Sequence, residues 1–175
     1  MERTKRWRAD PRVWLSLLLV LAVLGVIFYF SAMPAKQSSG ASGGFVTRLI
    51  RFFLPDFPSL SAERQRQIRR LVTVLVRKTA HVLEYAALGF SLRVHLGALG
   101  RHWPVRRLWL WAWLIGVICA AGDEVHQLFV PGRGPRLYDV GVDAVGVILG
   151  VLFYLLCRRI LTRRRPKSEN EAPSP

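Results

Sequence analysis

Long apolar blocks alternate along this chain with shorter segments that carry most of the charged residues. The first block, residues 13–30, contains eighteen residues and no charge. At about 1.5 Å per residue, a helix of this length crosses a hydrocarbon core of about 30 Å. The block is longer than the apolar region of a signal peptide, about 7–15 residues, which favours a first transmembrane helix.

Three further blocks follow, and ionisable residues lie inside or beside each of them. The second covers about residues 71–96, the third residues 108–121 and the fourth about residues 138–157. Trp109, Trp111 and Trp113 open the third block, as is typical of a helix that leaves the membrane interface. The pattern predicts an all-α integral membrane bundle of four transmembrane helices.

The segment between the first two blocks, residues 31–70, has two parts with different patterns. Residues 38–44 read SSGASGG, which is typical of a flexible linker. Residues 45–54 read FVTRLIRFFL, in which one helical face is apolar (Phe45, Leu49, Phe52, Phe53) and two arginines lie off it. This spacing predicts a short amphipathic helix at the membrane surface. Two prolines end it, and residues 59–70 are expected to begin the second spanning helix.

The chain is strongly basic, with 26 Lys and Arg against 11 Asp and Glu and a net charge of +15. Such a charge also fits nucleic-acid binding. However, five basic residues precede the first apolar block and six follow the last, where topology signals belong. An N-terminus inside the cell places fifteen basic residues on the cytoplasmic side, Arg93 among them, and nine on the other side.

We therefore expect both termini in the cytoplasm and no nucleic-acid partner. Residues 1–12 are interpreted as a basic cytoplasmic leader. Residues 158–175 are interpreted as a basic cytoplasmic tail, and they lack the apolar pattern that a packed helix needs, which indicates disorder.

Ionisable residues inside the predicted helices form three groups. Lys78, His81, Glu84 and Tyr85 are spaced three and four apart, so they share one face of the second helix. The other two groups are Asp123, Glu124, Gln127 and Arg133 at the end of the third helix, and Asp139 and Asp143 in a stripe with Gly146 and Gly150 in the fourth. With the expected orientation, all three groups fall toward the extracytoplasmic half of the membrane.

Such a cluster is costly, because each charge at the membrane centre costs about 2.5–3.5 kcal/mol. Two interpretations stay open: mutual ion pairs that fix the bundle, or a polar pocket open to the outside, which we favour. We expect His81 and Glu84 to face Asp123 and Gln127. We also expect Arg133 to fold back from its loop and fork a carboxylate, with Glu124 and Asp139 within its reach.

No metal or other cofactor is predicted. His81 has no second histidine at helical spacing and lies in neither an HExxH nor an HxxEH motif. Cys119 and Cys157 lie inside apolar blocks and do not suggest a disulfide framework. Acid–base chemistry fits better, because His81 beside Glu84 would form a tunable proton acceptor, and Asp123 is a further candidate catalytic residue.

Three motifs carry a resemblance to a known family. They are K-x-x-H-x-x-E-Y-x-x-L-G at residues 78–89, D-E-x-x-Q-x-F-x-P-G-R at residues 123–133 and D-x-x-x-D-x-x-G-x-x-x-G at residues 139–150. With these motifs the chain resembles the VanZ-like family, named for an accessory protein of resistance to the glycopeptide teicoplanin. The resemblance covers most of the chain, and we assign residues 13–157 to one VanZ-like domain. It implies a small multi-pass protein of the bacterial inner membrane and cell envelope.

Three functional hypotheses follow. The first is that the outward pocket binds an envelope lipid or a lipid-linked head group, with Lys78, Arg133 and Arg136 meeting phosphates. The second is hydrolysis or transfer on such a lipid, so whether the protein is an enzyme stays open. The third, a small oligomeric transporter or proton path, is weaker because four helices lack the repeats and broken helices of secondary carriers.

Overall fold

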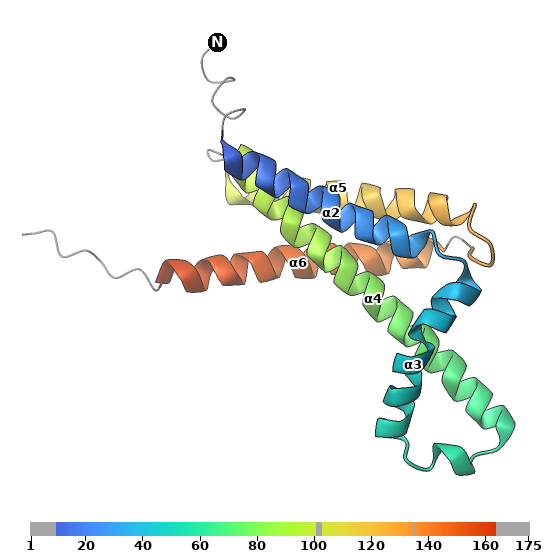
Figure 1. The fold of residues 1–175 in the computed structure, drawn as a ribbon. Coiled ribbons are helices and arrows are strands. Elements are labelled where there is room, and N and C mark those ends of the chain that lie inside the picture. The colour runs from blue at the N-terminus through green and yellow to red at the C-terminus, as the bar shows by residue number, and fades with distance from the viewer. Residues whose placement is uncertain (1–9, 101–102, 135, 164–175) are drawn as a thin grey trace, which may run out of the picture.

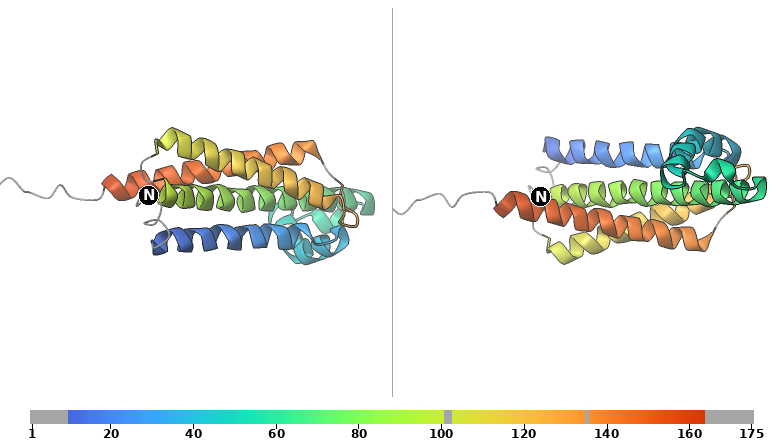
Figure 2. Two further views of the ribbon diagram at one scale, coloured as in Figure 1. Left: turned by 90° about the horizontal axis from the view of Figure 1, so that it is seen from above. Right: turned by 90° about the horizontal axis from the view of Figure 1, so that it is seen from below.

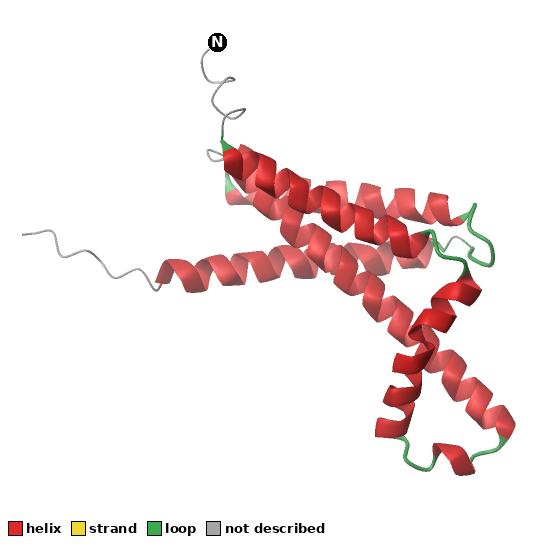
Figure 3. Cartoon of the chain, viewed as in Figure 1, coloured by secondary structure: helices red, strands yellow, loops and turns green. Residues whose placement is uncertain are grey.

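The computed structural model describes residues 10–100, 103–134 and 136–163. All regular structure in this part of the chain is helical, as Figure 1 and Figure 3 show, so the predicted all-α fold is confirmed. The helices are α2 (Pro11–Ser31), α3 (Ala35–Phe53), the short 3-10 helix η1 (Phe57–Ser59), α4 (Ala62–Leu99), α5 (Val105–Gln127) and α6 (Leu137–Arg163).

Among the described helices, three are long and apolar enough to cross a membrane: α2, α5 and α6. They correspond to the first, third and fourth apolar blocks of the sequence. α4 is not among them, because Lys78, His81 and Glu84 interrupt its apolar stretch. Its 38 residues would extend for about 57 Å, almost twice the thickness of a membrane core.

α4 is the central helix of the molecule and contacts α2, α3, α5 and α6 (Figure 2). Glycines allow its close approach to α6. A Cβ atom at Gly150 would lie 1.8 Å from the carbonyl oxygen of Ala86, and one at Gly146 would lie 2.6 Å from that of Val82. Gly89 of α4 is equally close to α6. The glycine stripe predicted in the last apolar block therefore packs against α4.

α3 and the first part of α4 form a hairpin that projects from the bundle (Figure 1). Val46, Ile50 and Phe57 are buried there and pack against α4. The prediction of a flexible linker at residues 38–44 is wrong, because these residues belong to α3. We attribute this to packing of the second half of α3 on α4, since tertiary contacts commonly override weak helix propensity.

The start of α2 and the end of α6 lie at the same end of the bundle, opposite the α3–α4 hairpin (Figure 2). Residues 158–163 of the expected disordered tail are helical and belong to α6. The rest of that tail and residues 1–9 of the basic leader lie outside the described residues. Arg93, which we assigned to a cytoplasmic loop, instead lies within α4 and is fully buried.

Candidate functional site

A polar cavity of about 80 Å³ lies where the middle of α4 meets the end of α5, the start of α6 and the loop between them. The polar residues that line it are Arg77, Lys78, His81, Glu124, Gln127, Arg133, Arg136, Asp139 and Asp143. The structure therefore brings residues from all three sequence groups to one place.

Asp123 and Gln127 form a buried hydrogen-bonded ring with Ser31, the last residue of α2. The Ser31 hydroxyl donates to Oδ2 of Asp123 at 2.7 Å. The Gln127 side-chain amide donates to that same oxygen at 2.8 Å and to the Ser31 hydroxyl at 2.9 Å. Among the described residues, Asp123 thus receives neutral donors and no guanidinium, and the ring fixes α2 against α5.

Two of the remaining carboxylates face cationic or ionisable groups of α4. The ammonium of Lys78 forms a salt bridge with Asp139 and lies 4.5 Å from the centre of the Tyr138 ring. Nδ1 of His81 lies 3.8 Å from Oδ1 of the buried Asp143, and the pair is ionic only when His81 is protonated. Oδ2 of Asp143 has no hydrogen-bond partner among the described residues.

Arg133 folds back from its loop as expected, but it does not fork a carboxylate. Its guanidinium donates to the carbonyl oxygens of Phe30 at 2.8 Å and Met33 at 3.0 Å, at the end of α2. The Phe30 carbonyl is in the last turn of α2 and the Met33 carbonyl lies just beyond it, so neither oxygen bonds to a following turn of α2 and both are open to Arg133. Glu124 instead accepts a 2.8 Å hydrogen bond from the backbone amide of Arg136.

The charge state of Arg133 follows from these contacts. Burial lowers the pKa of its guanidinium, and the nearby Arg77 lowers it further, whereas Asp123, Glu84 and Glu124 raise it. The guanidinium of an arginine is not deprotonated in proteins, so the group stays charged at neutral pH. Arg133 therefore brings a positive charge to the cavity, and its direct partners there are neutral carbonyls.

Three of the predicted site residues do not line the cavity: Asp123, which lies in the hydrogen-bonded ring, and Tyr85 and Glu84 of α4. Tyr85 is completely buried, and its hydroxyl has no hydrogen-bond partner in the described part of the chain. Glu84 is partly buried and near enough to act electrostatically on Arg133, but it is absent from the cavity wall. Tyr85 and Glu84 both lie deeper along the same face of α4 as His81.

Sequence reasoning missed two residues of this region, Ser31 and Arg77. Ser31 follows an apolar run, so we interpreted it as the first residue of a loop. The sequence feature that could have identified Ser31 is a small hydroxyl residue at the end of a transmembrane span, because such a hydroxyl can hydrogen-bond to a neighbouring helix. Arg77 was not among the expected site residues, although it directly precedes Lys78, the first residue of the first motif.

The described residues contain no group of three or more His, Cys, Asp or Glu side chains arranged to hold a metal ion. Carboxylates and one imidazole do gather here. However, Ser31, Lys78 and the Arg136 amide already engage three of the carboxylates. The arrangement is therefore better suited to hydrogen bonding and charge pairing than to coordination.

A family model provides the assignment that these motifs suggested. The VanZ/LLP1 model matches residues 16–158, which is most of the chain. The chain belongs to the VanZ/LLP1 family. The matched region begins within α2 and ends within α6, so it includes every residue of the cavity wall. Together with its apolar helices, this makes the chain a VanZ-like membrane protein. Searches of curated proteins and of solved structures found no match.

Proposed function

We propose that this VanZ/LLP1 protein binds the head group of an envelope lipid, or of a lipid-linked precursor, in its polar cavity. The observation that carries the proposal is the cavity wall at one end of the bundle, in which four basic side chains gather. Only Lys78 among them has a salt-bridge partner in the described residues. If the cavity wall served only to form internal ion pairs, more of its basic side chains would have a carboxylate partner.

The proposal includes α4 as a fourth transmembrane helix. α4 contacts all three apolar spans. Its backbone approaches that of α6 at Gly89 and Gly150, as is typical of helices that associate within membranes. Its ionisable residues at positions 78–85 are partly or fully buried and lie among the other helices, not on a lipid-facing surface. They lower the mean hydropathy of α4, so an average taken along the sequence does not identify α4 as a membrane span.

The proposed orientation places the cavity at the extracytoplasmic surface of the bacterial inner membrane, with both termini in the cytoplasm. The described end of the bundle away from the cavity carries Arg12, Arg106, Arg107, Arg158, Arg159 and Arg163. Arg93 no longer counts toward a loop, which weakens the basic-residue bias without reversing it. The α3–α4 hairpin would then lie at the outer membrane surface, with Phe52 and Phe53 (77% and 70% exposed) facing lipid.

A direct test compares lipid retention by variants in native mass spectrometry of the detergent-solubilised protein. We expect the unmodified chain to keep a phosphate-bearing lipid and Arg77→Gln/Arg136→Gln to lose it, because charge-assisted bonds to phosphate would be removed. The matched control, Arg159→Gln/Arg163→Gln, removes two arginines at the opposite end and should keep the lipid. Equal retention by the two double variants would reject the cavity as the binding site.

A second candidate function is hydrolysis or transfer on such a lipid. One observation favours it: His81 lines the cavity with Nδ1 directed at Asp143, an arrangement in which a carboxylate orients a general base. Turnover of an added lipid phosphate by the unmodified chain, lost in His81→Gln, would support catalysis. Glu84→Ala and Asp123→Ala test the other two candidate catalytic residues in the same assay. A homo-oligomer, which a transporter would require, would be detected by the number of chains per complex in native mass spectrometry.

A further inference from the structure

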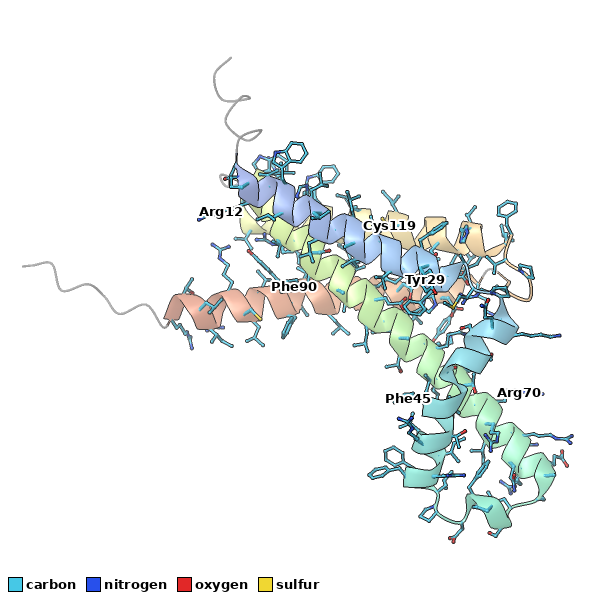
Figure 4. The ribbon with its side chains drawn as sticks, viewed as in Figure 1. Arg12, Tyr29, Phe45, Arg70, Phe90 and Cys119 are labelled. Carbon is cyan, nitrogen blue, oxygen red and sulfur yellow. The ribbon has the colours of Figure 1, made fainter. Side chains whose placement is uncertain are left out.

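An apolar groove of about 520 Å³ runs between α3 and α4. α3 contributes Phe45, Leu49 and Phe53, and α4 contributes Val76, Ala80 and Leu83. Figure 4 labels Phe45 on α3, and both Phe45 and Leu83 are more than half exposed. A continuous apolar surface of this kind is unfavourable in water, so it requires a membrane or an apolar ligand to cover it.

The groove and the polar cavity share one stretch of α4 as their common wall. Val76 and Ala80 line the groove, whereas Arg77 and His81 line the cavity. Arg77 and Ala80 are three residues apart, so their Cβ atoms are neighbours on the helix surface at about 5–6 Å. A single molecule can therefore touch both surfaces by passing around one side of α4.

The charges beside the groove select the polar end of such a molecule. Arg77 and Arg136 have no carboxylate within salt-bridge distance among the described residues. Arg133 is held by two carbonyl oxygens and keeps its charge. Lys78, by contrast, is neutralised by Asp139. Guanidinium groups match the oxygens of a phosphate in pairs, so three of them in one cavity wall favour a phosphate over a neutral carbohydrate.

We infer that the ligand is a phosphate-bearing lipid whose phosphate contacts Arg77, Arg133 and Arg136 and whose hydrocarbon chain lies in the α3–α4 groove. The inference rests on the proposed function and adds the three side chains that contact the phosphate and the position of the hydrocarbon chain. Two observations fix this occupant: the groove adjoins the cavity along α4, and the positive charge lies at the end where a phosphate would be.

Photoaffinity labelling tests the position of the chain. The full protein is placed in phosphatidylcholine nanodiscs with phosphatidic acid that carries a diazirine in one acyl chain. We expect the label on residues 45–54 and 72–83. Unlabelled phosphatidic acid should compete, whereas diacylglycerol with the same chains should not. A polyprenyl monophosphate is the third competitor. If it competes more strongly than phosphatidic acid, the ligand is an isoprenoid lipid; if it competes less strongly, the ligand is a glycerophospholipid.

Matched variants separate the two parts of the ligand. Arg77→Gln should lower labelling about tenfold, the usual weight of one charge-assisted bond. The control Arg70→Gln, two turns earlier on the same face and exposed, should not. Ala80→Trp fills the groove and should move the label elsewhere, whereas Ala87→Trp, exposed on the same helix, should leave it in place.

The outcomes also separate this inference from the proposed function. Labelling spread evenly over all lipid-facing helices would overturn the inference. If glycerol phosphate still binds in an Arg77-dependent way, the head-group function survives that result. Labelling of the groove that is unchanged by phosphate-bearing competitors and by Arg77→Gln would reject both the inference and the proposed function. A crosslink joining the grooves of two chains would assign the groove to a second copy and overturn the inference as well.

Discussion

Ser31 donates a hydrogen bond of 2.7 Å to Asp123, across a separation of 92 residues in sequence. The bond joins the last residue of α2 to the last turn of α5, and Gln127 closes it into a ring. Both ends of this bond are buried. The ring positions Arg133 indirectly, because Arg133 binds the carbonyl oxygens of Phe30, in the last turn of α2, and of Met33, two residues after its end. A shift of the end of α2 would therefore also move Arg133 and change the shape of the cavity.

The first prediction is that Ser31→Ala lowers the free energy of unfolding by about 1–3 kcal/mol, the cost of leaving a buried carboxylate oxygen short of a donor. Thermal unfolding in detergent micelles measures it. Ser42→Ala is the matched control, because the Ser42 hydroxyl bonds only to carbonyls within α3. Equal stability of the two variants would show that the ring contributes nothing.

The second prediction concerns the contact between α4 and α6. Gly150→Ala places a Cβ atom 1.8 Å from a backbone oxygen that cannot move without shifting α4. We expect a loss of about 1–3 kcal/mol or more from this overpacking. Gly141→Ala on the same helix meets nothing within 4 Å and should be neutral or stabilising by about 1 kcal/mol. Thermal unfolding measures both effects. Equal melting temperatures for Gly150→Ala and Gly141→Ala would contradict the close contact between α4 and α6.

Part of this architecture was predictable from residue periodicity. The apolar blocks indicated the helices, and spacings of three and four placed Lys78 and His81 on one face. The stripe of Gly146 and Gly150 likewise indicated a close helix contact, which the structure contains. These features depend on local spacing, and such spacing fixes the face of a helix on which a residue lies.

Other features depend on contacts that a sequence does not encode locally. The helical state of residues 38–44 depends on α3 packing against α4, which their Gly and Ser content opposes. The partner of Arg133 could not be chosen in advance, because every helix end offers carbonyl oxygens and these carry no signature in the sequence. Ser31 gained its role from the distant Asp123.

The third prediction concerns membrane topology. In a Cys119→Ser/Cys157→Ser background, Ser38→Cys and Gly134→Cys should react with a membrane-impermeant maleimide in intact cells. Arg159→Cys, at the opposite end of the bundle, should react only after permeabilisation. The physical reason is the larger number of basic residues on the side that carries the termini. Labelling of positions 38 and 134 from the cytoplasm alone would reverse the orientation.

The fourth prediction is a pair of double-mutant cycles on Asp139. Lys78→Gln and Asp139→Asn should couple, because the two residues form a salt bridge. We expect a coupling free energy of about 0.5–3 kcal/mol. Arg133→Gln and Asp139→Asn should be additive within about 0.5 kcal/mol, because Arg133 bonds to α2 instead. The reverse pattern in unfolding measurements would mean that Arg133 pairs with the carboxylate after all.

The fifth prediction concerns Arg93, whose side chain is 0% exposed and whose guanidinium nitrogens have no hydrogen-bond partner among the described residues. The Tyr154 ring lies 4.7 Å from its Cζ atom, and a cation–π contact of this kind is worth about 2 kcal/mol when desolvated. Burying one ion without a counter-ion costs several kcal/mol, so the penalty exceeds the gain.

Arg93→Met keeps a long, unbranched side chain and removes the charge, so it should leave the melting temperature unchanged or raise it. Arg106→Met is the control, because Arg106 is exposed at the same end of the bundle, and its melting temperature should not change. A fall in stability of more than about 2 kcal/mol in Arg93→Met alone exceeds what the ring contact can supply. That result would require a counter-ion for Arg93, which the assembled protein or the membrane would have to provide.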